Sequence, residues 1–316
     1  MRANGRAMTG SGTLLEDGQR PCLASLGGLV EDRVGRFART NSGGLSVPGR
    51  MERSFGGAAF NACRTAAALG VRVALRAPLD EAGRRAAGRA ALAAGVSLTA
   101  DETAHALPSY TALVQPNGGL FGALADMEAL ERWRPGCPWA HVDAAPTLCL
   151  VDANLAAPTL RDAIASAPAP VAAMTVSTDK AIRLLDMLQD IALILTNRAE
   201  AEALVGRFGA PTEAAERLVR RGAGAACVTD GAQGAAWASP DGSGVVPAAR
   251  ATIVDVIGAG DAFAGAVLAA LARRVPLPQA VTVGVRAAAI AIGHAGAWSP
   301  DFAAAIGELE MTDAHA

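Results

Sequence analysis

The sequence of 316 residues has few cysteines, no basic excess and no long apolar run. Its five cysteines are scattered, odd in number and without a C-x-x-C pair, so neither a disulfide framework nor a zinc site is indicated. The formal net charge of −2 gives no reason to expect nucleic acid as a partner. The sequence has no run of about 18 apolar residues, the length that a membrane-spanning helix needs. We therefore expect neither nucleic acid nor a membrane as partner. The simplest explanation of the scattered cysteines is that they are reduced thiols in a cytoplasmic protein.

Short apolar runs alternate with alanine-rich stretches from about residue 21 onward. The former predict buried strands and the latter helices, several of which end at a glycine. Strands are expected at 22–30, 71–77, 147–155, 190–197 and 225–231, and helices at 56–70, 82–95, 262–274 and 277–293. This alternation implies an α/β fold with a mostly parallel sheet covered by helices on both faces.

Two glycine-rich segments interrupt this rhythm. Residues 109–127 hold two apolar runs around Pro116-Asn117-Gly118-Gly119, which predicts a hairpin, and residues 33–55 are strand-like as well. We expect a small β-sheet lid that projects from the main body, with strands drawn from about 29–55 and 107–125. Because exposed sheet edges and apolar lid faces tend to be paired, we also expect a homodimer through the lid.

The ends of the chain differ from this pattern. Residues 1–20 carry positive charge but no apolar core of signal-peptide type, so we expect a poorly ordered leader. One domain is then expected to cover residues 21–316.

Four turns between expected strands and helices are candidate ligand sites, and two of them pair glycines with an acidic or amide side chain. The four turns are Gly56-Gly57 before Asn61, "TNRAE" at 196–200, "TDGAQG" at 229–234 and "GAGD" at 258–261. Ligands of parallel sheets bind at such turns, where glycine lets backbone N–H groups approach phosphate oxygens. The sequence has no G-x-x-x-x-G-K-[ST] motif and no G-x-G-x-x-G at its first strand, so neither a P-loop nor a dinucleotide fold is indicated.

Asp261 follows the last of these turns, where a helix is about to begin. A helix N-terminus attracts anions through its free N–H groups and its dipole. Two interpretations are open: the carboxylate caps the helix, or it acts as a base beside a bound phosphate.

The order of the four turns resembles the ribokinase-like (PfkB) family of carbohydrate and nucleoside kinases. "DVIGAGD" (255–261) matches the family's closing Asp-Thr-x-Gly-Ala-Gly-Asp, and "GGAAFNACRTAAALG" (56–70) matches its amino-terminal motif. The Asn-x-x-Glu and Thr-x-Gly-x-x-Gly motifs are matched at 197–200 and 229–234. The resemblance covers roughly residues 21–300 and implies a ribokinase-like fold.

On the phosphate side, the resemblance implies ATP and Mg²⁺ as cofactors. Asp261 matches the base that takes the proton from the acceptor hydroxyl, and the turn Gly258-Ala259-Gly260 matches the anion hole for the migrating phosphoryl group. The nucleotide-binding positions are Asn197, Thr229, Gly231 and Gly234. Glu200 matches the residue that organises Mg²⁺ through water, although Asn197 and Glu200 could instead only cap a helix. Asp255 matches a ligand of a monovalent cation, and Val256 stands where the family has threonine, which leaves potassium open.

On the acceptor side, "GGLVEDRVGR" (27–36) matches the family's Gly-Gly-x-x-x-Asp, and this resemblance makes Asp32 the candidate to hold sugar hydroxyls. A carboxylate can accept from two adjacent hydroxyls of a ribose, which fits this role. By the resemblance, Gly56, Gly57 and Asn61 complete the sugar pocket. The alternatives are that Asp32 is an exposed strand-end residue and that Asn61 is only a polar residue of a helix interior.

Within the family, the chain is most similar to pseudouridine kinases. "TNSGG" (40–44), the stretch 109–131 and "VDANLAAPTL" (151–160) carry this similarity, which implies that Thr40, Asn41 and Asp126 contact the substrate. Asp126 could instead only cap the helix that follows. The expected reaction is transfer of the γ-phosphoryl group of ATP to the 5′-hydroxyl of pseudouridine. The alternatives are another ribonucleoside or a free sugar, as in ribokinases and fructokinases, and a non-catalytic binding protein.

Overall fold

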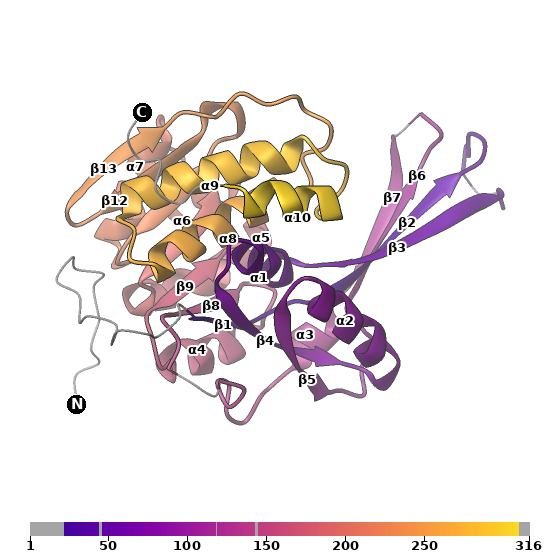
Figure 1. Ribbon diagram of the computed structural model, residues 1–316, viewed down its shortest axis with the longest axis horizontal. Helices are drawn as coiled ribbons and strands as arrows, with labels where there is room; N and C mark the ends of the chain where they lie inside the picture. Colours follow the sequence, from indigo (N-terminus) through magenta and orange to yellow (C-terminus); the bar gives the residue numbers. More distant parts are fainter. Residues whose placement is uncertain (1–21, 44–45, 118, 143–144, 310–316) are drawn as a thin grey trace.

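Nine strands form the central sheet of the computed structural model, which describes residues 22–43, 46–117, 119–142 and 145–309 (Figure 1). The leader expected at 1–20 lies outside the described residues. In spatial order the strands are β13 (Gly242–Val246), β12 (Ala235–Ser239), β11 (Ala226–Thr229), β10 (Leu193–Asn197), β9 (Val171–Met174), β8 (Leu148–Asp152), β1 (Cys22–Leu26), β4 (Arg72–Leu79) and β5 (Val96–Glu102). All neighbours from β11 to β5 pair in parallel, and β12 and β13 are antiparallel. The predicted mostly parallel sheet is confirmed.

The strand order reverses direction beside β1. From there the chain adds β4 and β5 on one side and later β8 to β11 on the other. In open α/β sheets a ligand crevice forms at such a point, outside the carboxyl ends of the strands. The carboxyl ends of β1 and β8 are therefore where a site is expected.

Helices cover both faces of the sheet, and side chains alternate along each strand between the two cores. On β8, Leu148 and Leu150 join one core while Cys149 and Val151 join the other. The first face is covered by α1 (Ala58–Ala68), α2 (Glu81–Ala93), α8 (Ala259–Ala272), α9 (Leu277–Ile292) and α10 (Pro300–Gly307). The second is covered by α3 (Glu128–Arg132), α4 (Ala157–Ala165), α5 (Thr178–Ala181), η1 (Ile182–Asp190), α6 (Arg198–Val205) and α7 (Pro211–Arg220). No helix among the described residues is long and apolar enough to cross a membrane.

Helices α1 and α8 pack closely because α8 has glycine at their contact. A Cβ on Gly265 would lie 2.3 Å from the carbonyl oxygen of Ala62, a distance that no side chain tolerates. The other residues of α8 from Ala262 to Ala272 are also buried and mostly alanine, which keeps this helix thin. The amino-terminal ends of the two helices thus meet above the central strands.

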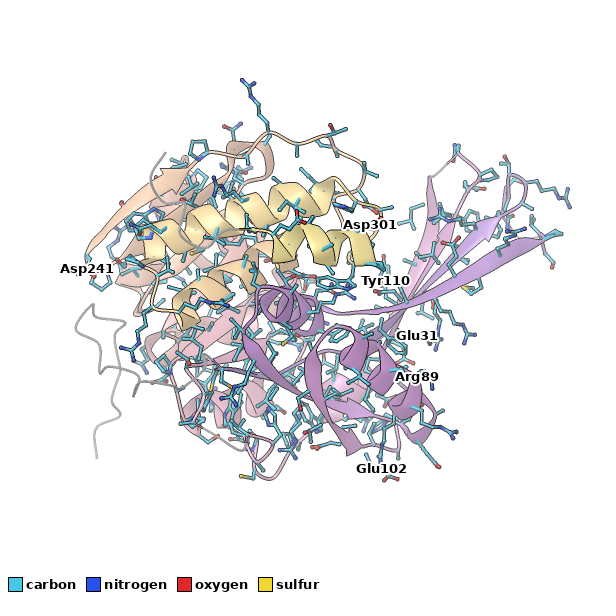
Figure 2. The ribbon with its side chains drawn as sticks, in the orientation of Figure 1. Glu31, Arg89, Glu102, Tyr110, Asp241 and Asp301 are labelled. Atoms are coloured by element: carbon cyan, nitrogen blue, oxygen red, sulfur yellow. The ribbon has the colours of Figure 1, made fainter. Side chains whose placement is uncertain are left out.

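A second sheet of four strands projects from the body (Figure 1). Its order is β3 (Gly49–Gly56), β2 (Val30–Phe37), β6 (Ser109–Val114) and β7 (Leu120–Asp126), and all pairs are antiparallel except β2 with β6. The hairpin predicted at 109–127 is present as β6 and β7. We call this sheet the lid. Figure 2 shows Glu31 and Tyr110 near its base.

Several large apolar side chains of the lid are exposed. They are Met51, Tyr110, Leu120, Phe121 and Leu124. Along β7 no described side chain is buried, so this strand presents both of its faces to solvent in the single chain.

Candidate functional site

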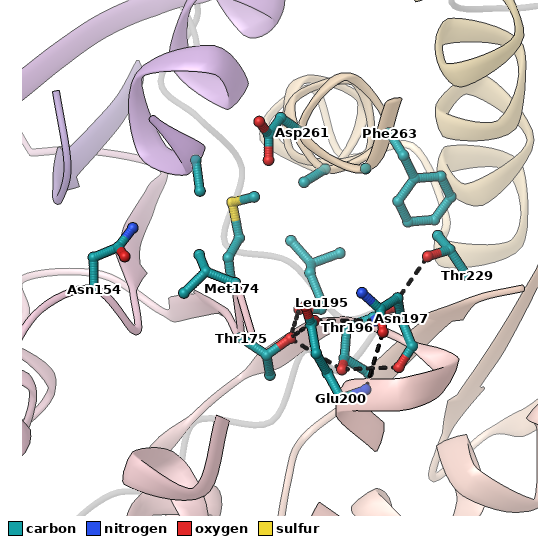
Figure 3. A pocket seen from close by; sticks show the side chains of 14 residues that line it. Asn154, Met174, Thr175, Leu195, Thr196, Asn197, Glu200, Thr229, Asp261 and Phe263 are labelled. Carbon is teal, nitrogen blue, oxygen red and sulfur yellow. Dashed lines mark hydrogen bonds between the residues drawn. The ribbon is translucent and has the colours of Figure 1, made fainter. Parts of the chain in front are cut away.

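A cavity of about 360 Å³ lies where the carboxyl ends of the central strands face the start of α8 (Figure 3). Gly260 and Asp261 line it from α8, and Thr229 lines it from the end of β11. Asn197 and Glu200 line it from the start of α6. Five of the residues predicted for phosphate and cofactor binding therefore share one cavity, as expected from the carboxyl ends of parallel strands.

Asp261 lies in the first turn of α8, but it does not cap that helix. The N-cap is Gly258, with a φ of 80° that favours glycine, and the helix has no side-chain cap. The carboxylate instead accepts a hydrogen bond of 2.6 Å from Nδ2 of Asn61. Among the described residues, the amide of Ala259 bonds only weakly to the carbonyl of Val256 (3.4 Å), and those of Gly260 and Asp261 have no acceptor. These amides are free to hold an anion at the positive end of the helix.

Burial raises the pKa of Asp261 to about 7. The hydrogen bond from Asn61 and the charge of Arg64 oppose this rise, while the carboxylates of Asp152 and Asp32 add to it. A carboxyl group whose pKa lies near neutral pH can both take up and release a proton there, which is the property that a general base needs.

Asp32 and Asn61 approach each other across the backbone of Gly56. A Cβ on Gly56 would lie 2.2 Å from Oδ2 of Asp32 and 3.6 Å from Oδ1 of Asn61, so only glycine leaves room for both. Oδ1 of Asn61 is buried and has no hydrogen-bond partner among the described residues. Burial raises the pKa of Asp32 to about 6, against the charge of Arg64. We call Asp32, Gly56, Asn61 and Asp261 the acceptor pocket.

The polar end of the cavity is a hydrogen-bonded cluster at the start of α6 (Figure 3). Asn197 is the N-cap of this helix and forms a capping box with Glu200. The hydroxyl of Thr175 donates to Oε2 of Glu200 and lies 3.0 Å from the hydroxyl of Thr196. The capping role that the sequence left open is thus present. Glu200 is also buried, with 8% of the residue exposed. Thr229 also reaches this cluster, through a bond of 3.4 Å to the carbonyl of Thr196.

The donor set at Glu200 suits Mg²⁺ only together with other oxygen ligands. The described part of the chain has no group of three or more His, Cys, Asp or Glu side chains that could hold a metal ion. A single carboxylate in a hydroxyl-rich cavity fits Mg²⁺, which keeps several waters and is usually shared with substrate phosphates.

Asp255 connects two loops beside the start of α8. Its Oδ1 accepts from the amide of Ile257 at 3.0 Å, and its Oδ2 accepts from the amide of Gly296 at 2.9 Å. The neighbouring Val256 is 67% exposed. The carboxylate therefore holds the 293–298 loop against the turn before α8, and these contacts leave the monovalent-cation site a prediction.

Thr40 and Asn41, two of the residues predicted to bind substrate, do not line the cavity. Thr40 and Asn41 follow the end of β2, whose opposite end pairs with Gly56. At about 3.3 Å per residue, the length of β2 puts them roughly 20 Å or more from the base of the lid. The backbone of Asn41 bonds to the side chain of Gln115 in the neighbouring hairpin. Its N–H donates to Oε1 at 3.0 Å, and its carbonyl accepts from Nε2 at 2.7 Å. Within one chain these two residues shape the far end of the lid.

Asp126 lies at the base of the lid, at the end of β7. It is exposed, and its Oδ1 accepts from the amide of Glu128 at 3.3 Å, although the N-cap of α3 is Met127. The cap-like alternative therefore has a contact in the structure, and substrate binding by Asp126 stays a prediction.

The predicted glycines of the nucleotide turn lie just beyond β11. Gly231 begins the short 3-10 helix η2 (Gly231–Gln233), and Gly234 closes it. A Cβ on Gly234 would lie 2.1 Å from the carbonyl of Val246, so this glycine is required by the β12–β13 hairpin. Gly57 precedes α1 as its N-cap.

Sequence reasoning missed four residues in and around the site. Thr175 and Asn154 line the cavity from the strand ends of β9 and β8. Lys180, the only lysine in the sequence, donates to Oδ1 of Asn154 at 2.7 Å and so fixes the orientation of that amide. Arg64 lies on α1, one turn after Asn61, and its charge acts on Asp261 and Asp32. Two signals in the sequence could have identified Lys180 and Arg64: the first is the sole lysine, and the second is an arginine within an alanine-rich helix.

Comparisons with known proteins agree with this arrangement. A family model described as "pfkB family carbohydrate kinase" matches residues 139–302. A carbohydrate kinase from Agrobacterium tumefaciens is 32% identical, with a TM-score of 0.79 over 92% of this chain and 97% of the other. The uncharacterised sugar kinase YegV of Escherichia coli (strain K12) is 39% identical over 107 residues, a match that spans only 33% of each chain.

Two more distant structures share the fold. The ribokinase of Arabidopsis thaliana, solved with ribose and ATP, is 17% identical with a TM-score of 0.77 over 92% of this chain and all of its own. The nucleoside kinase of Methanocaldococcus jannaschii is 16% identical with a TM-score of 0.72 over 92% and 99%. These confirm the predicted ribokinase-like fold. Together with the family match and the relative from Agrobacterium tumefaciens, they lead to one conclusion: the chain belongs to the pfkB family of carbohydrate kinases.

Proposed function

We propose that this protein transfers the γ-phosphoryl group of ATP to the 5′-hydroxyl of pseudouridine, giving pseudouridine 5′-phosphate and ADP. The observation that carries the phosphoryl transfer is the contact between Asn61 and Asp261, which joins the acceptor pocket to the free amides of α8. The choice of pseudouridine within the family is supported by the sequence similarity at 40–44, 109–131 and 151–160.

Asp261 acts as the base in this proposal. Its carboxylate takes the proton of the 5′-hydroxyl while a bond forms between the 5′-oxygen and the γ-phosphorus. The bond from that phosphorus to the bridging oxygen of ADP breaks, and the amides of Ala259, Gly260 and Asp261 stabilise the charge on the migrating group. The proton on Asp261 then passes to solvent.

Asp32 and Asn61 orient the acceptor. The carboxylate of Asp32 accepts from the two adjacent ribose hydroxyls, and the unpartnered Oδ1 of Asn61 shares the proton of one of them. A buried acceptor without a partner destabilises the empty site, and a sugar hydroxyl satisfies it.

Asn197, Thr229 and the turn at Gly231 and Gly234 would bind the nucleotide, and Glu200 would hold Mg²⁺ through water. The ion would supply charge neutralisation for the phosphates. In the same proposal Asp255 contributes to a monovalent-cation site. That part is tested by assaying activity in potassium against sodium, where equal rates would remove it.

The lid would close over the acceptor pocket and exclude water that could hydrolyse ATP. Its exposed apolar residues favour a homodimer formed lid to lid. Replacing Leu124 with aspartate, against Leu92→Asp on the exposed surface of α2 as control, tests this assembly by light scattering. A wild-type protein that is monomeric at all concentrations would remove the dimer.

The competing function is phosphorylation of another ribonucleoside or of a free sugar. The relatives include ribokinases and a nucleoside kinase, and the diol contact at Asp32 suits any ribose. The deciding experiment measures ADP release with pseudouridine, uridine, adenosine, ribose and fructose. Pseudouridine should give the highest kcat/KM. A preference for a free sugar would remove the nucleoside assignment, and no ADP release with any acceptor would favour a binding protein.

A cytoplasmic location belongs to the same proposal. All five cysteines are free, and four of them are buried within the cores. Fractionation that finds the protein in an oxidising compartment would contradict it.

A further inference from the structure

Arg64 is a buried arginine of α1 that lies within the motif at 56–70, at a position to which the family resemblance assigns no role. It lies one turn after Asn61 and hence on the same face of the helix. Its Nη1 donates to the carbonyl of Phe55 at 3.0 Å. The guanidinium carbon lies 5.2 Å from the ring centroid of Phe60 and 4.8 Å from that of Trp298. The charged group is therefore held in one place by a hydrogen bond and by two aromatic rings.

The charge of Arg64 is not used in an ion pair with any described residue. The residue is 5% exposed, and its Nε is buried without a hydrogen-bond partner. A buried cation without a paired anion destabilises a fold by several kcal/mol. The two carboxylates whose charges favour its protonated form are Asp261 and Asp32, both in the acceptor pocket.

Arg64 differs in charge from the other ionisable groups that act on Asp261. The charged groups that act on this carboxylate are Arg64 from α1, Asp152 from β8 and Asp32 from β2. Arg64 is thus the one cation among them, against two anions, while Asn61 contributes a neutral donor. Burial lowers the pKa of Arg64 to about 9, so it remains a cation throughout the neutral range.

We propose that Arg64 is a positioning residue that fixes the charge state of the acceptor pocket and so sets the lower pH limit of phosphoryl transfer. Its guanidinium favours the ionised, proton-accepting form of Asp261 without touching the reacting atoms. Burial first, and then the carboxylates of Asp152 and Asp32, favour the protonated form, in which Asp261 cannot act as a base.

The test compares variants that keep or remove the charge. Arg64→Gln removes the charge and retains a polar side-chain amide, whereas Arg64→Lys keeps the charge. Trp298→Leu removes one stacking ring and leaves the charge in place. The titration of Asp261 is followed by NMR on protein labelled with ¹³C at the aspartate carboxyl carbons, and Asp261→Asn and Asp32→Asn assign the signals. No substrate is needed, so the outcome does not depend on which acceptor the enzyme uses.

In Arg64→Gln the midpoint for Asp261 should rise by about one pH unit, the effect expected of one opposite charge nearby. It should stay close to the wild-type value in Arg64→Lys and in Trp298→Leu. The acid limb of kcat/KM with pseudouridine should move upward in Arg64→Gln by the same amount. An unchanged Asp261 midpoint in a folded Arg64→Gln protein, or a Lys variant that titrates like Gln, would overturn the proposal. If the wild-type enzyme does not phosphorylate pseudouridine at all, the proposed substrate is contradicted, whereas the NMR test of Arg64 remains valid.

Discussion

Nδ2 of Asn61 donates a hydrogen bond of 2.6 Å to the carboxylate of Asp261, although 200 positions of sequence separate the two residues. Asn61 lies on α1, next to the strand of the lid that carries Gly56, and Asp261 lies in the turn of α8 that offers free amides. One contact therefore connects the part of the chain that would hold the acceptor with the part that would hold the phosphate. Each of the following predictions depends on this geometry.

Asp261→Asn should lower kcat roughly 100- to 10,000-fold, the range in which a positioned base contributes. The amide keeps the shape of the side chain, so the KM for the acceptor should change little. Steady-state kinetics with Mg·ATP checks this. The matched control is Asp301→Asn in the first turn of α10, an exposed carboxylate that does not line the cavity, and it should retain its activity. Near-normal turnover in Asp261→Asn would remove Asp261 as the base.

Asn61→Ala should shift the activity profile toward higher pH. Loss of the donor leaves the Asp261 carboxylate less stabilised, so its pKa rises further above about 7. We expect roughly a 10- to 100-fold loss of kcat/KM at neutral pH, the effect of a hydrogen bond to a charged group, and partial recovery at alkaline pH. Thr65→Val is the control, because among the described residues the Thr65 hydroxyl has one hydrogen-bond partner, the carbonyl of Asn61. A uniform loss at every pH would show that Asn61 acts in some other way.

Stability should depend on pH through Asp261 in a direction opposite to that of an ion-paired carboxylate. Its pKa is 3.8 as a free group and about 7 in the fold, so between these values the folded state binds a proton that the unfolded state has released. The contribution to the free energy of unfolding is complete below the lower value and is lost as the pH rises to the upper one.

Urea unfolding of the wild type and of Asp261→Asn at about pH 5 and about pH 8 measures this loss. The variant should gain stability relative to the wild type as the pH rises, because its amide does not ionise. A stability difference that is the same at both pH values would contradict the raised pKa.

Gly265→Ala should destabilise the protein by about 1–3 kcal/mol, because the added carbon has no room between α8 and α1. Separation of the two helices should also weaken the contact between Asn61 and Asp261, so kcat should fall with stability. Gly88→Ala in α2 is the matched control: its Cβ meets nothing within 4 Å, and alanine in a helix interior stabilises by about 0.5–1 kcal/mol. Equal stabilities of the two variants would show that α1 and α8 can move apart freely.

Much of the fold followed from local pattern. The hairpin of β6 and β7, the helices α1, α8 and α9, and the parallel strands β1, β4, β8, β10 and β11 have signals within a few residues, namely turn glycines and apolar periodicity. The antiparallel edge strands β12 and β13 were not predicted, nor were β5, β9, α4 and α10. These are short or partly polar segments whose structure depends on the sheet or core that they join.

The sequence by itself determined the four turns and the acidic and amide residues at or beside them, because backbone geometry and anion binding at helix ends are local properties. Only the tertiary structure decided which of these residues meet. It joined Asn61 to Asp261, let the charge of Arg64 act on Asp261 without an ion pair, and carried Thr40 and Asn41 away from the cavity. The physical reason is that pKa shifts and charge balance arise from burial among groups distant in sequence, and neither composition nor spacing records which groups those are.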